Sequence, residues 1–178
     1  MKVQISKGVG EGPTELSAFD QALVKAGIAN FNLIYLSSVL PPNSDVVVPV
    51  KPERPVGEWG DRLYIVIAQM RTIQRNQEVW AGIGWMQDLK TKQGLLVEHE
   101  GHNEAEVRAD IENSLNGLAK NRRQEFGPMH MEVIGGRCEN KPVCALVAAV
   151  FESEPWQANT TDNNVSSLRR IARKLNNR

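Results

Sequence analysis

The order of strand-like and helix-like segments constrains this fold more than any other feature of the sequence. Eight short apolar segments have the length and composition of strands, and only two stretches show helical periodicity. The strand-like segments are residues 2–7, 32–36, 46–50, 63–68, 80–86, 94–100, 129–134 and 143–151. With the helices inserted, the order is β-α-β-β-β-β-β-α-β-β, which is not the strict alternation of a doubly wound sheet. We therefore predict an α+β fold in which sheets and helices pack as layers.

The two helices have recognisable ends. The first is predicted over residues 14–26, with Thr14 as the N-cap and Gly27 as the C-terminal stop. The second follows the capping residue Asn103 and ends before Gly127. Both carry an apolar stripe that can pack on a sheet.

Composition favours one cytoplasmic domain with a neutral surface. The chain has 178 residues, 21 Lys/Arg and 21 Asp/Glu, so a strongly basic nucleic-acid binder is disfavoured and nucleic acid is not an expected partner. No apolar run has the length of a membrane helix, and residues 1–7 lack the apolar core of a secretion signal. Cys138 and Cys144 are expected to be reduced.

A glycine-rich segment and a pair of histidines could suggest phosphate or metal binding, but both have ordinary structural explanations. Gly8, Gly10 and Gly12 follow a strand and precede a helix, but their spacing does not match a phosphate-binding loop and Glu11 would repel phosphate. We predict a turn over residues 8–13. His99 and His102 allow a metal site or a solvated turn, and the turn is favoured because so short a motif is weak evidence.

The pair Ser37-Ser38 at a strand end, just before Pro41-Pro42, permits two interpretations. Serines in this position commonly form a turn. Alternatively, a serine hydroxyl can attack the preceding carbonyl, convert the amide to an ester and break the chain. The new N-terminal residue then becomes a pyruvoyl group, whose ketone forms a Schiff base with an amine and acts as an electron sink.

Three motifs in the same order resemble one known family. They are ELSAFD at the start of residues 15–28, LSSVLPP at residues 36–42 and LLVEHEG at residues 95–101. Together they resemble the pyruvoyl-dependent arginine decarboxylases. The resemblance implies an αββα sandwich with mixed, mostly antiparallel sheets, assembled as a homotrimer with active sites at subunit interfaces. Whether trimers pair into a dimer of trimers is left open.

The resemblance also implies roles for individual residues. Ser38 would become the covalent pyruvoyl cofactor, with no pyridoxal phosphate and no metal, after cleavage between Ser37 and Ser38. Glu98 would donate a proton to the substrate α-carbon. Its apolar strand permits two placements, a partly buried one that would favour the protonated form and an outward one. Asp20 would bind the guanidinium group as a carboxylate partner.

Three further positions complete the implied substrate site. Asn32 would contact the substrate, Leu16 would form an apolar wall, and the carbonyl end of Ser37 would line the site. Leu16 and Asp20 are four residues apart on the predicted helix, so they share a face. Judged without the resemblance, Asp20 is an ordinary solvated aspartate and Asn32 an ordinary turn residue.

The resemblance thus predicts one decarboxylase domain over residues 1–156, in a protein that cleaves itself into chains 1–37 and 38–178. The predicted reaction converts L-arginine to agmatine and carbon dioxide, in polyamine biosynthesis or arginine catabolism. Residues 157–178 contain five Lys/Arg and one Asp, and we predict a flexible basic tail. Two alternatives remain: a pyruvoyl decarboxylase for another amino acid, and a non-catalytic binding or assembly protein of the same fold.

Overall fold

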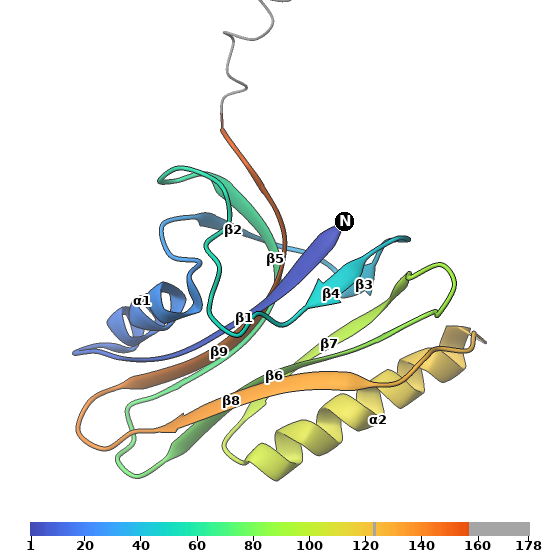
Figure 1. Cartoon of the computed structure of the whole chain (residues 1–178). Helices are drawn as coiled ribbons and strands as arrows, with labels where there is room; N and C mark the ends of the chain where they lie inside the picture. Colours follow the sequence, from blue (N-terminus) through green and yellow to red (C-terminus); the bar gives the residue numbers. More distant parts are fainter. Residues whose placement is uncertain (123, 157–178) are drawn as a thin grey trace, which may run out of the picture.

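The structure, a computed structural model, describes residues 1–122 and 124–156. Its elements divide into two sheets and two helices (Figure 1). Along the chain they are β1 (Lys2–Glu11), α1 (Glu15–Ala26), β2 (Asn32–Tyr35), β3 (Val39–Leu40), β4 (Asp45–Val47), β5 (Arg62–Thr72), β6 (Glu78–Gln87), β7 (Gly94–Gly101), α2 (Glu104–Arg122), β8 (His130–Arg137) and β9 (Val143–Glu154). The predicted tail lies outside the described residues.

The strands form two sheets that pack face to face. The five-stranded sheet has the order β2-β5-β9-β1-β4, and the four-stranded sheet has the order β3-β7-β6-β8. Pairing is antiparallel except between β1 and β4 and between β2 and β5. α1 covers the outer face of the first sheet and α2 the outer face of the second (Figure 1). The predicted α+β, αββα sandwich is therefore confirmed.

Three apolar layers hold the sandwich together. The central layer lies between the sheets and includes Ile5, Ala81 and Leu96. α1 packs on the first sheet through a row of small residues, Ala18, Ala22 and Ala26, which are fully buried. α2 packs on the second sheet through larger ones, Val107, Ile111 and Leu115. Burial of these side chains away from water is the main stabilising force.

The prediction of a turn over residues 8–13 is wrong, because β1 continues to Glu11. Gly8 and Gly10 lie inside the strand, beneath α1. A Cβ atom at Gly10 would lie 2.2 Å from the carbonyl oxygen of Ala18, a distance that real side chains do not reach. The glycines therefore serve close packing of a helix on a strand rather than chain reversal.

The helix ends agree with the prediction in detail. Thr14 caps α1, and Ser17 completes the reciprocal capping box that a glutamate usually supplies. Gly27 ends the helix in the left-handed conformation, at φ 76°. The Asn103 side chain accepts hydrogen bonds from the backbone N–H groups of Ala105 and Glu106 at the start of α2. Among the described residues, no helix is long and apolar enough to cross a membrane.

Candidate active site

The Ser37-Ser38 pair lies where the chain crosses from one sheet to the other. Before it, the Leu36 N–H donates to the carbonyl of Ile65 in the first sheet, at 2.8 Å. After it, the Ser38 carbonyl accepts from the N–H of Leu96 in β7, at 3.0 Å. The crossing strand β3 begins at the next residue, Val39. Short strands on both sides thus hold the serine pair at a defined place between the layers.

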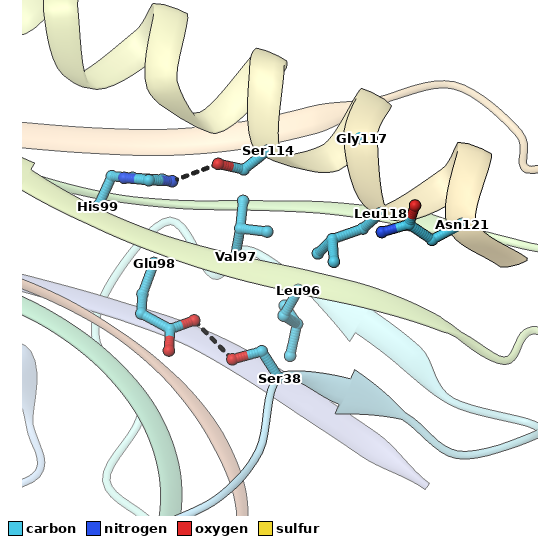
Figure 2. A pocket seen from close by; sticks show the side chains of 9 residues that line it. All are labelled: Ser38, Leu96, Val97, Glu98, His99, Ser114, Gly117, Leu118 and Asn121. Carbon is cyan, nitrogen blue, oxygen red and sulfur yellow. Dashed lines mark hydrogen bonds between the residues drawn. The ribbon is translucent and has the colours of Figure 1, made fainter.

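Ser38 contacts the glutamate that the sequence places in the same site. The Ser38 hydroxyl donates to Oε2 of Glu98 at 2.6 Å, across 60 residues of sequence (Figure 2). Glu98 lies on β7, opposite Ile83 of β6. It is exposed in the single chain, so of the two placements that its strand permits the structure shows the outward one. The carboxylate is positioned to accept the hydroxyl proton.

The carbonyl before Ser38 is also hydrogen-bonded. The N–H of Val39 donates to the Ser37 carbonyl oxygen at 2.8 Å, which closes a three-residue turn centred on Ser38. A donor on that oxygen stabilises negative charge when a nucleophile adds to the carbonyl carbon. Residues 37–39 therefore supply a nucleophile and a polarised electrophile, and Glu98 of β7 supplies a base beside them.

A cavity of about 450 Å³ borders this pair. The cavity continues past the edge of β7 to α2. This edge is not covered there, because β3 pairs with β7 only at Gly94 and Leu95. On the α2 side, His99 Nε2 and Ser114 Oγ lie 2.8 Å apart (Figure 2). Sequence reasoning missed the α2 residues of this cavity, Ser114, Gly117, Leu118 and Asn121. Their spacing along one helix face is the signal that could have identified them.

The two histidines of the possible metal motif point to different partners. His99 meets Ser114, whereas Nδ1 of His102 lies 2.7 Å from the Glu78 carbonyl oxygen. No group of three or more His, Cys, Asp or Glu side chains within residues 1–122 and 124–156 is arranged to hold a metal ion.

One chain does not bring the predicted substrate-binding residues together. Leu16 and Asp20 are exposed on α1, and Leu16 has 69% of its surface accessible. Asn32 is exposed at the start of β2. α1 packs over Gly10 close to the position of Asp20. Across β9, Gly10 has the same register position as Arg71 of β5. Asn32 pairs with Arg62 of β5 instead.

Arg71 and Arg62, the β5 residues at the positions of Gly10 and Asn32, are nine residues apart along the strand. Within one chain, Asn32 and Asp20 are therefore far apart. Asp20 also lies beyond the first sheet from Glu98, because α1 covers the outer face of that sheet. Of the predicted site residues, the structure groups only Ser37, Ser38 and Glu98.

The fold and this cluster describe an αββα protein in which a serine hydroxyl is hydrogen-bonded to a glutamate and directly follows a carbonyl that accepts a backbone N–H. Comparisons with known proteins agree with the family that the sequence motifs resemble. Residues 2–155 match the family described as pyruvoyl-dependent arginine decarboxylase (PvlArgDC). A pyruvoyl-dependent arginine decarboxylase of Thermococcus kodakarensis is 30% identical over 83% of this chain and 92% of its own length. The chain therefore belongs to the pyruvoyl-dependent arginine decarboxylase family.

Two other relatives with the same name match over shorter stretches. The protein of Picrophilus torridus is 33% identical over 61% of this chain and 59% of its own length. The protein of Methanothermobacter thermautotrophicus is 42% identical over 47% of this chain and 52% of its own length. The chain thus spans between half and three fifths of these two relatives.

Proposed function

We propose that this protein is a self-processing, pyruvoyl-dependent decarboxylase that converts L-arginine to agmatine and carbon dioxide. The observation that carries the proposal is the 2.6 Å hydrogen bond from the Ser38 hydroxyl to Glu98, next to a Ser37 carbonyl that already accepts from Val39. Membership of the family supports the choice of cofactor and substrate.

Self-cleavage follows from this geometry. Glu98 takes the hydroxyl proton as Ser38 Oγ adds to the Ser37 carbonyl carbon, and the Val39 N–H stabilises the oxyanion. The C–N bond breaks and an ester replaces the amide. Loss of the Ser38 α-proton then breaks the Cβ–Oγ bond and releases Ser37 as a carboxylate. The enamine left at residue 38 takes up one water and releases ammonia, which leaves a ketone.

The residues present fit that ketone as the resident cofactor. A pyruvoyl group supplies an electron sink for the electrons left when carbon dioxide departs. Glu98 would remain beside residue 38 after cleavage, where it holds a proton for the substrate α-carbon. Domain 1–156 would then consist of two polypeptides, residues 1–37 and the chain that starts at residue 38.

Substrate recognition requires a second copy of the chain. Asp20, Leu16 and Asn32 are exposed and separated within one chain, which is expected if each completes a site on a neighbouring subunit. We propose a homotrimer in which Asp20 binds the guanidinium as a bidentate partner and Leu16 covers the alkyl chain. The proposed location is the cytoplasm, with agmatine used in polyamine biosynthesis or formed in arginine catabolism.

Mass spectrometry of the purified protein tests processing. The expected products are residues 1–37 and a second chain from residue 38, and Ser38→Ala is expected to remain intact and inactive. Ser37→Ala is the matched control, because it keeps the attacked carbonyl and the Ser38 hydroxyl and should still be cleaved. A single intact wild-type chain after prolonged incubation would refute self-processing.

A substrate panel tests the second half of the proposal. Agmatine and carbon dioxide are expected from L-arginine, with far slower release from lysine or ornithine, whose ammonium groups cannot form a bidentate pair. A cleaved protein that acts on another amino acid would preserve the processing step and overturn the substrate assignment. An uncleaved, inactive protein would instead favour a binding or assembly role.

A further inference from the structure

We infer that Trp156 is a positioning residue for the Asn32 amide and acts through the carbonyl group of Gly60. This inference rests on the proposed function, in which Asn32 contacts the substrate. It concerns three residues that are far apart in sequence but meet at one atom. The Gly60 carbonyl oxygen accepts from Nδ2 of Asn32 at 2.5 Å and from Nε1 of Trp156 at 2.6 Å.

These two bonds use the hydrogen-bonding capacity of that oxygen. A carbonyl oxygen has two lone pairs, and each has a side-chain donor here. Trp156 therefore helps to fix where the oxygen points, and the oxygen fixes the Asn32 amide. The backbone beside it is also tied, since the Gly60 N–H donates to Asn30 and the Asn32 N–H donates to Asp61, both at 2.7 Å.

The arrangement determines which end of the Asn32 amide faces outward. A carbonyl neighbour must face the NH₂ end, so the amide nitrogen is held by Gly60 and Oδ1 is left as an acceptor. Asn32 is exposed, so this acceptor is available to another molecule. An oriented acceptor suits a ligand rich in N–H donors, such as a guanidinium or an ammonium group.

Trp156 is itself held in place by Arg62. The Arg62 guanidinium lies 5.0 Å from the centre of the Trp156 ring, and its Nη2 donates to the Pro155 carbonyl at 2.8 Å. Arg62 also pairs with Glu154 at 3.3 Å. Since the Arg62 backbone also pairs with Asn32 in the sheet, one residue of β5 contacts both the end of β9 and the start of β2. Stacking on Arg62 keeps the indole N–H directed at Gly60.

The sharpest test removes the indole N–H and keeps an aromatic ring. Trp156→Phe preserves stacking on Arg62 but cannot donate to Gly60. The matched control is Trp59→Phe, in the loop that carries Gly60, where Trp59 is 81% exposed. We expect Trp156→Phe to raise KM for L-arginine about fivefold, the effect of one hydrogen bond, with kcat within about twofold. Trp59→Phe should leave both constants unchanged.

A double-mutant cycle separates positioning from a general effect on folding. In an Asn32→Ala background there is no amide to orient, so adding Trp156→Phe should have no further effect on KM. A purely structural role for Trp156 predicts the same fivefold change in both backgrounds. That outcome, or an unchanged KM in the single variant, would overturn the inference.

A second readout does not depend on the proposed activity. The Asn32 side-chain NH₂ signal, identified in an NMR spectrum by its loss in Asn32→Asp, should exchange with solvent several-fold faster in Trp156→Phe than in the wild type or Trp59→Phe. Unchanged exchange would refute the contact. If exchange accelerates but the wild type makes no agmatine, the positioning stands and the proposed function fails.

Discussion

The cleavage segment and the substrate-recognition residues differ in how complete they are within one chain. Ser38, Glu98 and the Val39 N–H already make the contacts that self-cleavage needs. Asp20, Leu16 and Asn32 are exposed, and the strand register places α1 near Asp20 and the start of β2 at different positions along β5. The first group meets within one chain, whereas in the proposed trimer the second group would be completed by a neighbouring chain.

This difference separates two steps in time. Cleavage needs only the folded chain, so its rate constant should not depend on protein concentration. In the proposed trimer, decarboxylation needs a neighbouring subunit, so activity should fall when the protein is diluted below the dissociation constant of the oligomer.

The largest effect is expected for Glu98→Gln. An amide cannot take the Ser38 proton or donate one from a carboxyl group, so turnover of the processed fraction should fall at least 1,000-fold and cleavage should slow. Product assays and denaturing gels measure the two steps separately. Glu100→Gln, an exposed neighbour on β7, is the control. Full activity in Glu98→Gln would remove its proposed role.

Asp20→Asn should lose recognition while retaining cleavage. Removing the charge proposed to face the guanidinium is expected to lower kcat/KM for L-arginine about 100-fold, since a lost charged hydrogen-bond partner costs about 2–5 kcal/mol. Cleavage between Ser37 and Ser38 should proceed at the wild-type rate. Glu15→Gln, on the same helix, controls for a general change of charge on α1. A cleavage defect in Asp20→Asn would contradict the separation of the two groups.

Mixed subunits sharpen this test. Ser38→Ala chains keep Asp20, and Asp20→Asn chains keep the processed residue 38. If sites form between subunits, refolding the two variants together should restore part of the activity that neither has alone. No gain on mixing, with mixed oligomers present by native mass spectrometry, would show that each chain builds its own recognition site.

Gly10→Ala tests the platform that carries Asp20. The added Cβ would meet the Ala18 carbonyl at 2.2 Å, so α1 must move outward, at an expected cost of about 2–4 kcal/mol in the free energy of unfolding. Gly117→Ala on α2 is the matched control, because nothing lies within 4 Å of its new Cβ. The control should be neutral or stabilised by up to about 1 kcal/mol. Urea denaturation distinguishes them.

The order of elements could be predicted because each signal is local. Thr14 and Gly27 mark the ends of α1 through their own backbone preferences. The strand segments are recognisable from their composition. β3 was missed because two residues before a proline carry no strand pattern, and only their pairing with β7 defines them. Gly8 and Gly10 suggested a turn because their actual constraint, the approach of α1, comes from a distant part of the chain.

The candidate site divides in the same way. Ser37, Ser38 and Glu98 could be selected from the sequence because they lie in motifs that resemble those of a known family. The structure then shows the hydrogen bond between Ser38 and Glu98. Ser114 on α2 and the Val39 N–H could not, since their place depends on how β7 passes between two layers. The bond from Trp156 to Gly60 likewise joins the end of β9 to a loop with no sequence signal of its own.

The smallest expected effect concerns Cys144, which lies fully buried beneath α1. Burial raises the pKa of its thiol to about 11, against a weaker opposing effect of Arg71. The raised value favours the folded state below the ordinary thiol pKa, and this contribution is lost as the pH rises toward 11. At pH 8 only about one thousandth of the thiol is ionised, so iodoacetamide should leave Cys144 unlabelled in the native protein.

Labelling of Cys144 also reports on the layer that presents Asp20. In Gly10→Ala, where α1 must shift, the Cys144 labelling rate at pH 8 should rise several-fold, because a loosened layer exposes the thiol and lowers its pKa. In Glu98→Gln the rate should not change, since that substitution lies in the other sheet. Peptide mass spectrometry after timed labelling measures both. Equal acceleration in the two variants would mean that the cleavage segment and the α1 layer are not mechanically independent, and the comparison between them would fail.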